Sequence, residues 1–332
     1  MSPAARPESF HVARGPGSAI DVGPLHGAVV AIGNFDGVHR GHRAVIDAAL
    51  ARAQSLGRKT AALTFLPHPR RFFRPQEPLF QLADERNKLR LLAATGLDGA
   101  IVMRFDAELA STTAEEFVDR ILVGRLGIGG AAIGFDFHFG KNRAGSPAFL
   151  TKQGVQLGFT VDIVPPLEDE GRPVSSGAVR TALTAGRVVE ATELLGAPWF
   201  VTAPVIHGDK RGRDLGFPTA NMKLDPACGL KHGIYAVRVS VQGRLCDGVA
   251  SFGRRPTFDD GAPLLEVFLF DFAGDLYGQT LDVAFIGWIR HEQKFDSIEA
   301  LTGAMKADAA QARDVLAREP RAFPALRDPV ND

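Results

Sequence analysis

The chain has 332 residues, 45% of them hydrophobic, and its 38 Lys and Arg residues are balanced by 38 Asp and Glu residues. This length and apolar content favour two domains with substantial cores, while the balanced charge argues against nucleic-acid binding, which requires a basic excess. The sequence has only two cysteines and no run approaching 18 apolar residues, so neither a disulfide framework nor a membrane helix is expected. We therefore expect a cytoplasmic protein without nucleic-acid or membrane partners, acting as a monomer or a transient homo-oligomer.

The first half of the sequence alternates short apolar runs with helix-like stretches. Residues 1–26 lack the apolar core of a signal peptide, and we expect them to form a flexible extension. The pattern from there to residue 187 predicts strands at 28–33, 60–65, 99–105, 130–135 and 159–164, and helices at 42–57, 84–96 and 114–127. Such alternation is typical of a parallel α/β sheet of the Rossmann-like kind. Ligands of these sheets bind at the carboxyl ends of the strands.

The second half has a different texture. Residues 188–197 indicate a short helical connector, and the segments that follow are rich in β-branched and aromatic residues. Those segments are 200–208, 233–243, 244–253, 263–272 and 279–289. Their spacing favours an antiparallel barrel or sandwich, followed by a helix to about residue 318, where Asp296 and Glu299 have capping-box spacing. We therefore expect an α/β domain at 27–187 and a β-barrel domain with a C-terminal helix at 198–326.

The stretch "GNFDGVHRGH" (33–42) follows the first predicted strand. Its two histidines, His39 and His42, would share a helix face and could bind a metal, but a metal site needs further ligands at set spacing. Two ordinary surface histidines are the other alternative. The three glycines permit a tight strand-to-helix turn whose N–H groups face an anion. We interpret the stretch as a phosphate-binding turn in which the histidines donate to phosphate oxygens.

This stretch resembles the HxGH signature of nucleotidyltransferases related to class I aminoacyl-tRNA synthetases. In particular it is similar to the bacterial bifunctional riboflavin kinase/FAD synthetase family, whose other motifs follow in order. "TFLPHP" (64–69) resembles the TFxPHP loop, and "GFDFHFGKNRAG" (134–145) resembles the GxDFxFGxxRxG segment. "VSSGAVR" (174–180) stands where the family carries SSTxxR, and "PTAN" (218–221) resembles the riboflavin kinase signature. The resemblance extends from about residue 27 to 318.

The resemblance implies that the first domain transfers an adenylyl group from ATP to FMN, with Mg²⁺ as cofactor. The implied ATP-binding residues are Gly33, Phe35, Asp36, Gly37, His39, Gly41, His42, Ser175, Ser176 and Arg180, of which His39, His42 and Arg180 would be catalytic. The implied FMN-binding residues are Phe65, His68, Pro69, Asp136, Phe137 and Phe139. From the residues alone, the two serines could be an ordinary helix cap, and the phenylalanines could form one face of a strand.

The second domain would phosphorylate riboflavin with ATP. The glycines and basic residues of 207–224 suit a loop that closes over phosphates, although by themselves they could form a solvated turn, and they do not form a Walker motif. The implied ATP-binding residues are Gly208, Lys210, Gly212, Arg213, Gly216, Pro218, Thr219 and Asn221. Of these, Thr219 and Asn221 would also hold Mg²⁺.

Glu266 stands inside an otherwise apolar predicted strand. Period-2 alternation would place it on one face with Phe268 and Phe270, where its carboxylate could take a proton from an alcohol. It could instead be an outward-facing residue on an edge strand. The resemblance implies the first role: Glu266 would be the base for the ribityl hydroxyl and would contact the flavin, together with Arg255.

Three residues depart from the family's pattern. Leu66 replaces a common acidic residue, Gly177 replaces a hydroxyl residue, and Phe268 replaces a common histidine. Two alternatives therefore remain beside the bifunctional enzyme. One is a riboflavin kinase with a degenerate adenylyltransferase domain, and the other is a non-catalytic flavin-binding regulatory protein.

Overall fold

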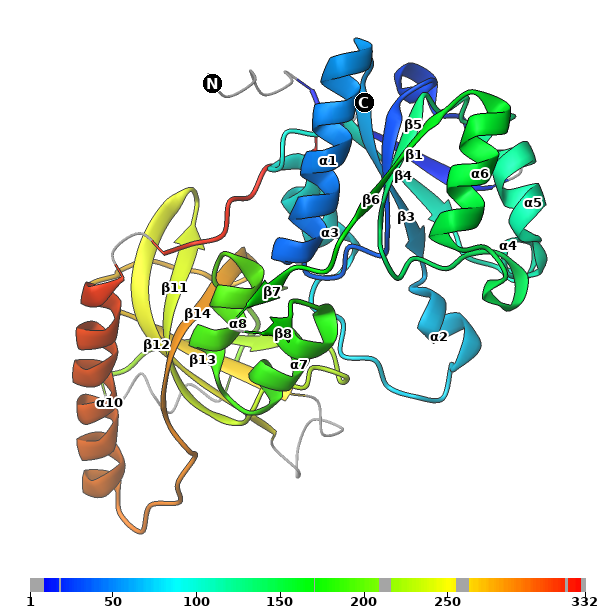
Figure 1. Cartoon of the computed structure of the whole chain (residues 1–332). Helices are drawn as coiled ribbons and strands as arrows, with labels where there is room; N and C mark the ends of the chain where they lie inside the picture. Colours follow the sequence, from blue (N-terminus) through cyan, green and yellow to red (C-terminus); the bar gives the residue numbers. More distant parts are fainter. Residues whose placement is uncertain are drawn as a thin grey trace. The chain divides into compact units, whose positions relative to one another are not determined.

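The computed structural model describes residues 9–17, 19–169, 171–208, 216–254, 263–319 and 322–329. The chain divides into two compact units. Unit 1 consists of Met1–Leu79, Ala83–Ser175 and Ala325–Asp332, and unit 2 consists of Phe80–Leu82 and Ser176–Pro324. Each unit is therefore built from segments that are separated in the sequence, and each has its own six-stranded sheet (Figure 1).

The sheet of unit 1 is parallel throughout and has the strand order β1-β4-β3-β2-β5-β6. Its strands are β1 (His11–Pro16), β2 (Val29–Ile32), β3 (Thr60–Leu66), β4 (Gly99–Arg104), β5 (Gly130–Gly134) and β6 (Thr160–Val164). The five predicted strands are present, and the prediction of a parallel α/β layer is confirmed. A two-stranded hairpin, β7 (Glu168–Asp169) and β8 (Arg172–Pro173), follows β6.

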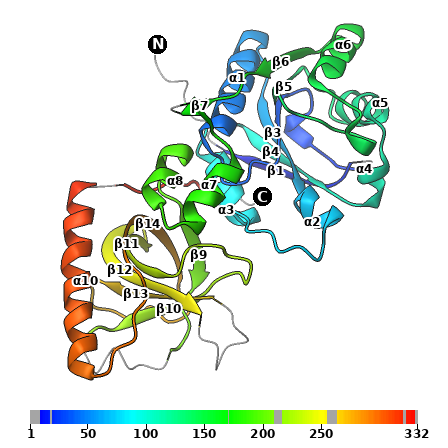
Figure 2. The same cartoon turned by 60° about the horizontal axis from the view of Figure 1, so that its bottom comes forward.

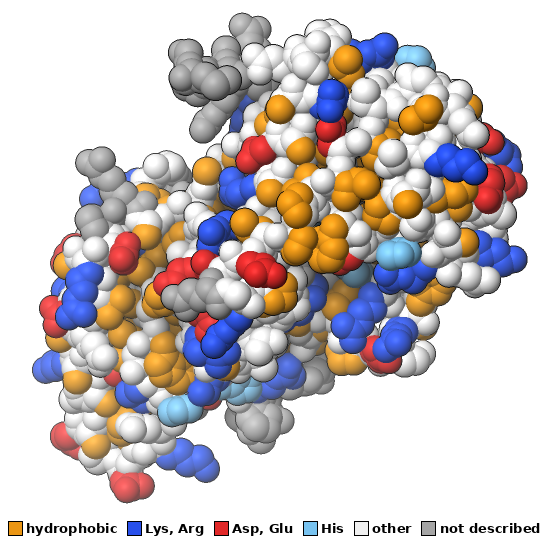
Figure 3. Space-filling model, in the orientation of Figure 1, with side chains coloured by type: hydrophobic (Ala, Val, Ile, Leu, Met, Phe, Trp, Pro, Cys, Tyr) orange, Lys and Arg blue, Asp and Glu red, His pale blue; other side chains and the backbone are white. Residues whose placement is uncertain are grey.

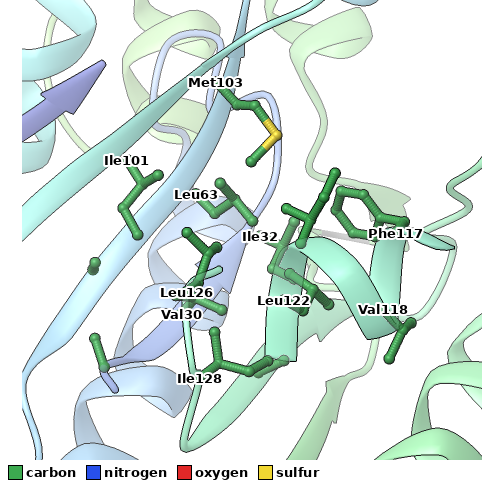
Figure 4. Close-up of a cluster of buried hydrophobic side chains, with 14 of the residues drawn as sticks. Val30, Ile32, Leu63, Ile101, Met103, Phe117, Val118, Leu122, Leu126 and Ile128 are labelled. Atoms are coloured by element: carbon green, nitrogen blue, oxygen red, sulfur yellow. The ribbon is translucent and has the colours of Figure 1, made fainter. Parts of the chain in front are cut away.

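Helices connect these strands. They are η1 (Gly23–Leu25), α1 (Arg40–Leu56), α2 (Pro69–Phe73), α3 (Glu85–Ala93), α4 (Ala107–Ser111), α5 (Ala114–Glu116), the π-helix η2 (Phe117–Val123), η3 (Lys141–Arg143) and α6 (Pro147–Leu157). Figure 4 shows a core in which Ile32 of β2 and Leu63 of β3 lie near Leu122 of η2. Because both faces of a parallel sheet are covered by crossovers, its strands read as continuous apolar runs.

The first strand differs from the expected flexible extension. Residues 11–16 form β1, which pairs in parallel with β4, and the side chains of Phe10 and Ile20 beside it are almost completely buried. β1 satisfies the hydrogen-bonding groups along the edge of β4 that would otherwise lie unpaired. Arg14, Gly15 and Pro16 interrupt the apolar pattern of this strand, so its sequence does not resemble a buried strand.

Unit 2 begins with two helices, α7 (Ser176–Thr184) and α8 (Val188–Leu195). Its antiparallel sheet has the order β10-β13-β12-β11-β14-β9. The strands are β9 (Phe200–Pro204), β10 (Thr219–Lys223), β11 (Gly233–Val241), β12 (Arg244–Arg254), β13 (Pro263–Leu269) and β14 (Thr280–Arg290). A bridge between Ile206 and Asn221 joins the two edges, so the sheet is a nearly closed barrel. The predicted antiparallel barrel is confirmed, although β10 was not among the predicted strands.

The C-terminal helix α10 (Ile298–Arg318) packs against β11, β12 and β14 of the barrel (Figure 2). Its predicted capping box is wrong. The helix is capped by Ser297, whose hydroxyl accepts a hydrogen bond from the backbone N–H of Ala300 at 3.1 Å. Asp296 lies one residue too early to cap, because the residue at the cap position must be the one whose side chain reaches the third helical N–H.

Charged side chains of both signs are interspersed over the face of the molecule shown in Figure 3. Within the described ranges, no helix is both long enough and apolar enough to span a membrane.

Candidate functional site

The turn between β2 and α1 carries the first motif. His39 caps α1: its Nδ1 accepts a hydrogen bond from the backbone N–H of His42 at 3.2 Å. The two imidazole rings are stacked, with centroids 3.6 Å apart and planes 18° from parallel. The N-terminus of a helix carries a partial positive charge and N–H groups without helical partners. The structure therefore places both histidines where an anion would be stabilised.

The environment of His42 determines its charge. Its Nδ1 atom is buried and has no hydrogen-bond partner among the residues that the structure describes. Burial, followed by the nearby His39 and Lys88, lowers the pKa of His42 well below 6.5. The ring is therefore neutral at pH 7, and a neutral imidazole can donate one hydrogen bond to a phosphate oxygen.

The turn itself is held by packing beneath it. Phe35 and Val38 have positive φ angles of 49° and 45°, which large or β-branched side chains rarely adopt. Both side chains are fully buried, so packing offsets the backbone strain. Asp36 is also buried, and its carboxylate accepts a hydrogen bond from the backbone N–H of Ala83 at 3.2 Å. The side chains of Phe35 and Asp36, which we predicted to bind ATP, thus support the turn from within the fold.

Gly41 brings the first and last motifs of unit 1 together. A Cβ atom at this position would lie 3.1 Å from the carbonyl oxygen of Val174 and 3.2 Å from the His39 ring. Because Val174 directly precedes Ser175, the serine motif begins against the first turn of α1. Arg40 and Asp169 form an ion pair of 3.0 Å between the same two regions. The other two glycines of the motif, Gly33 and Gly37, lie in the turn before His39, and Gly37 has a φ of 82°.

The serine motif crosses the boundary between the two units. Ser175 belongs to unit 1, whereas Ser176 and Arg180 belong to unit 2. α7 begins at Ser176, as the sequence predicted. Arg180 donates a hydrogen bond through its Nε to the carbonyl oxygen of Phe80 at 2.6 Å, so part of its guanidinium holds the 80–82 segment against α7.

The predicted FMN-binding residues come from two loops of unit 1. Phe65 lies near the end of β3, Pro69 is the first residue of α2, and His68 caps that helix by accepting from the Arg70 N–H at 3.1 Å. Asp136 and Phe137 lie in the segment after β5, with Asp136 exposed.

The phenylalanines after β5 do not form the face of a strand. β5 ends at Gly134, and the chain then turns. Phe139 is buried in the core of unit 1, where its ring centroid lies 5.3 Å from that of Phe117 and 5.4 Å from that of Phe137. Phe139 therefore mainly anchors this loop to the core.

Three strands of unit 2 align the residues of the kinase motifs. Asn221 of β10 stands opposite Glu266 of β13, and Glu266 stands opposite Ser251 of β12. Residues directly opposite each other in an antiparallel pair project to the same face. β13 lies between β10 and β12 in the sheet, so the alternative of an edge-strand position for Glu266 is wrong. We call Asn221, Glu266 and Ser251 the polar row.

Thr219 and Asn221 lie together at one end of the polar row. The Asn221 Nδ2 atom donates to the backbone carbonyl of Thr219 at 3.2 Å and lies 3.5 Å from its hydroxyl. A Cβ atom at Gly208 would lie 2.5 Å from the same Nδ2 atom, so a larger residue here would displace the Asn221 side chain. Gly216 and Pro218 are exposed beside them. Lys210, Gly212, Arg213 and Arg255 lie outside the described residues.

Phe268, which stands where relatives commonly have histidine, is part of an aromatic cluster. Its ring centroid lies 5.0 Å from that of Phe217 and 5.8 Å from that of Phe270. The predicted aromatic environment near Glu266 is therefore present.

Sequence reasoning missed one carboxylate near the polar row. Burial and then the negative charge of Glu266 raise the pKa of Glu292, and His232 opposes them; the Nδ1 of His232 lies 4.0 Å from Oε2 of Glu292. A Cβ atom at Gly253 would collide with the Glu292 carboxylate. A single acidic residue just after a strand gives no signal in sequence, because its position depends on the return of the chain to β12.

Neither site is a preformed metal cage. Within the described parts of the chain, no three His, Cys, Asp or Glu side chains lie together as a metal site would require, so His39 and His42 gain no third ligand there. Thr219 and Asn221 offer a hydroxyl and an amide oxygen. Such hard oxygen donors suit Mg²⁺, which usually keeps few protein ligands and takes the rest from phosphates and water.

Two family models match the chain. The model described as FAD synthetase matches residues 23–178, and the model described as riboflavin kinase matches residues 195–316.

Relatives match nearly the whole chain. A protein of Pseudomonas fluorescens named bifunctional riboflavin kinase/FMN adenylyltransferase is 45% identical over 89% of this chain and 95% of its own length. Proteins of the same name from Escherichia coli K12 and Bacillus subtilis 168 are 38% and 37% identical, over 88% and 86% of this chain and 93% and 91% of theirs. A crystal structure described as a macrolide-efflux protein from Streptococcus pneumoniae is 34% identical, with a TM-score of 0.81 over 89% of this chain and 96% of its own.

Proposed function

Because this chain belongs to the family of bifunctional riboflavin kinase/FMN adenylyltransferases, we propose that the turn of His39 and His42 is its adenylyl-transfer site and that the polar row is its phosphoryl-transfer site. The enzyme phosphorylates riboflavin to FMN and adenylylates FMN to FAD. The observation that carries the proposal is the stacked histidine pair at the N-terminus of α1, in which His39 and the Nδ1 atom of His42 are buried and against which the serine motif begins.

In adenylyl transfer, the phosphate of FMN attacks the α-phosphorus of ATP and pyrophosphate leaves. The attacking oxygen is already an anion, so no protein base is needed. Rate enhancement then depends on alignment of the two reactants and on stabilisation of phosphate charge. We propose that neutral His42, His39, Ser175, Ser176 and Arg180 supply these contacts.

The proposed FMN pocket is formed by the loops after β3 and β5. Phe65, His68, Pro69, Asp136 and Phe137 are its proposed contacts. Phe139 would support this pocket from the core rather than touch the flavin, because its ring is buried among other phenylalanines.

In phosphoryl transfer, the ribityl 5′-hydroxyl of riboflavin attacks the γ-phosphorus of ATP and ADP leaves. We propose that Glu266 accepts the hydroxyl proton, since its strand position faces Asn221 and Ser251. Thr219 and Asn221 would hold Mg²⁺, which supplies positive charge to the phosphates when it is bound. Glu292, whose pKa is raised by burial and by the nearby charge of Glu266, belongs to the same proposed site.

Domain limits and setting are part of the proposal. The adenylyltransferase domain would span 27–187 and the kinase domain 198–326, with 188–197 as connector. ATP, riboflavin and FMN are the proposed small-molecule partners, and nucleic acid and membranes are not. The reactions would take place in the cytoplasm, with the enzyme as a monomer or a transient homo-oligomer.

A product assay on the full-length enzyme tests the adenylyl-transfer site. The protein is incubated with riboflavin, ATP and Mg²⁺, and FMN is separated from FAD by chromatography. We expect His42→Ala to abolish FAD formation while FMN accumulates at the wild-type rate. His26→Ala, which changes an exposed histidine of the same unit, serves as the control and should make both products. Near wild-type FAD formation by His42→Ala would show that the phosphate contacts lie elsewhere.

The same assay tests Glu266. We expect Glu266→Gln to lose FMN formation from riboflavin but to convert added FMN to FAD at the wild-type rate. A variant that retains most of its kinase turnover would exclude Glu266 as the base.

A further inference from the structure

A lysine lies buried behind the adenylyl-transfer turn. The Lys88 side chain on α3 is only 1% exposed, and its Nζ atom has no hydrogen-bond partner among the described residues. A buried ammonium without a bonded partner is costly. An apolar residue would pack on the inner side of the helix without the free-energy cost of burying an ammonium group. The presence of Lys88 there therefore needs an explanation beyond packing.

The charges around Lys88 connect it to the turn. Burial lowers the pKa of Lys88, while Asp36 and Glu85 oppose that shift. Asp36 belongs to the turn, and its bond to the Ala83 N–H fastens the turn to the chain directly before α3. The charge of Lys88 is also one of the causes that lower the pKa of His42. Lys88 thus interacts electrostatically with Asp36 in the turn and with His42 at the start of α1.

We propose that Lys88 is a positioning residue of the adenylyl-transfer site, a fixed positive charge beneath the turn that stabilises the ATP phosphates at the N-terminus of α1 without touching them. This inference rests on the proposed function, because it requires that the turn between β2 and α1 binds those phosphates.

Burial makes such a charge effective at a distance. Solvent and salt screen exposed charges strongly, but they screen a charge in the protein interior much less. Two carboxylates only partly offset the burial of Lys88: Asp36 also bonds a backbone N–H, and Glu85 is exposed and paired with Arg14. An incoming triphosphate would complete the balance, and its affinity would fall if the ammonium were removed. A lysine that merely filled space would not affect ATP affinity in this way.

The test separates charge from shape in the full-length enzyme. Lys88→Met and Lys88→Gln remove the charge, and Lys88→Arg keeps it. We measure KM for ATP and kcat in FAD formation, and KM for pyrophosphate in the reverse reaction, in which FAD and pyrophosphate give FMN and ATP. Both neutral variants should raise these KM values about tenfold, which corresponds to about 1.4 kcal/mol. Lys88→Arg should restore them to within about threefold.

Two controls belong to the same preparations. Riboflavin phosphorylation uses the other proposed site, so its kcat/KM should remain at the wild-type value in every Lys88 variant. Arg86→Met removes a positive charge from an exposed position on α3 and should leave KM for ATP unchanged. A tenfold effect restricted to the neutral Lys88 variants would support the proposal.

Three results would overturn it. KM values at the wild-type level in either folded neutral variant would leave Lys88 a purely structural role. A loss in Lys88→Arg as large as that in Lys88→Met would indicate that shape, not charge, matters. If His42→Ala also keeps full FAD formation, the proposed phosphate site is wrong. If His42→Ala loses FAD formation but the Lys88 variants behave as wild type, the proposed function stands and the inference about Lys88 fails.

Discussion

At the proposed adenylyl-transfer site, His42 would meet phosphate as a neutral donor, because burial lowers its pKa. An imidazole that carried a full charge in the free enzyme would be costly in its half-buried position behind His39. The positive potential is supplied without that cost by three other groups: the N-terminus of α1, the stacked ring of His39 and the buried Lys88. In the proposed site, His42 would contact the ligand directly, whereas the buried Lys88 would act on it only through its charge.

The depressed pKa of His42 predicts how stability depends on pH. As pH falls below about 6.5, His42 becomes protonated in the unfolded chain but stays neutral in the folded chain. The free energy of unfolding therefore decreases by at most about 1.4 kcal/mol per pH unit. Above pH 6.5 this contribution is constant. Urea unfolding of the wild type and of His42→Gln at pH 5.5 and 7.5 measures it. The wild type should lose more stability than the variant between the two values, and equal losses would contradict the depressed pKa.

Gly41 is predicted to be indispensable for the first site. A methyl group there would press on the Val174 carbonyl and on the His39 ring, so Gly41→Ala should shift the serine motif or the capping histidine. We expect FAD formation to fall at least tenfold, since small misplacements of reacting groups cost about 10²-fold, while FMN formation persists. Gly303→Ala, in a helix where a Cβ meets open space, is the matched control. An unchanged rate of FAD formation in Gly41→Ala would refute the tight contact.

At the scale of elements, the structure shows which of two neighbouring residues, Asp296 or Ser297, caps α10, and a sequence pattern does not show this. Ser297 accepts the Ala300 N–H, and the helix then covers three strands of the barrel. Replacing an N-cap serine by alanine typically costs about 1 kcal/mol. Ser297→Ala should therefore lower the free energy of unfolding of unit 2 by about that amount, whereas Asp296→Ala should change it little. Chemical denaturation followed by tryptophan fluorescence can compare them, and a larger effect at Asp296 would restore the sequence-based cap.

The barrel also shows how element position decides chemistry. β10 contains Thr219, Asn221 and Lys223, and it pairs in antiparallel with β13. That pairing places Asn221 opposite Glu266, and the bridge from Ile206 to Asn221 brings the other barrel edge to the same place. Closure of the barrel therefore assembles the proposed kinase site from strands far apart in sequence.

At the scale of the whole molecule, each unit includes a short segment that lies, in sequence, within or after the other unit. Residues 80–82 belong with unit 2, where Arg180 and the indole of Trp199 bond to the carbonyls of Phe80 and Leu82. Residues near the C-terminus belong with unit 1, where Arg90 pairs with Asp328 at 3.0 Å. Limits drawn from sequence texture cannot detect such exchanges, because three residues in a loop carry no compositional signal.

The presence of two separate sites in one chain predicts complementation in trans. FMN made at one site can reach the other through solvent, so a mixture of His42→Ala and Glu266→Gln should produce FAD from riboflavin although neither variant does so alone. Chromatography should detect FMN first and FAD after a lag that shortens with protein concentration. If each variant performs its remaining reaction but the mixture makes no FAD, the kinase site of His42→Ala does not release FMN into solvent.

Local patterns predicted much of the local structure around the proposed adenylyl-transfer site. His39, His42 and Gly41 stand within four residues, and their role at a helix start follows from a glycine-rich turn after an apolar run. Lys88, by contrast, looks like any lysine of an amphipathic helix until its burial is known. Phe35 and Asp36 were expected to bind ATP, and the structure shows that their side chains are buried within the fold. The direction in which a side chain points in a turn depends on the φ angles of the turn, and the sequence alone does not specify these angles.

The sequence by itself determined five of the six strands in each sheet, the change from a parallel to an antiparallel unit, and the motifs that resemble those of the family, because apolar periodicity and glycine placement act over a few residues. Only the tertiary structure decided that β1 completes the first sheet, that Val174 lies against Gly41, and that Glu292 returns to β12. These contacts join residues far apart in the chain, and their energy comes from burial and pairing that exist only in the folded molecule.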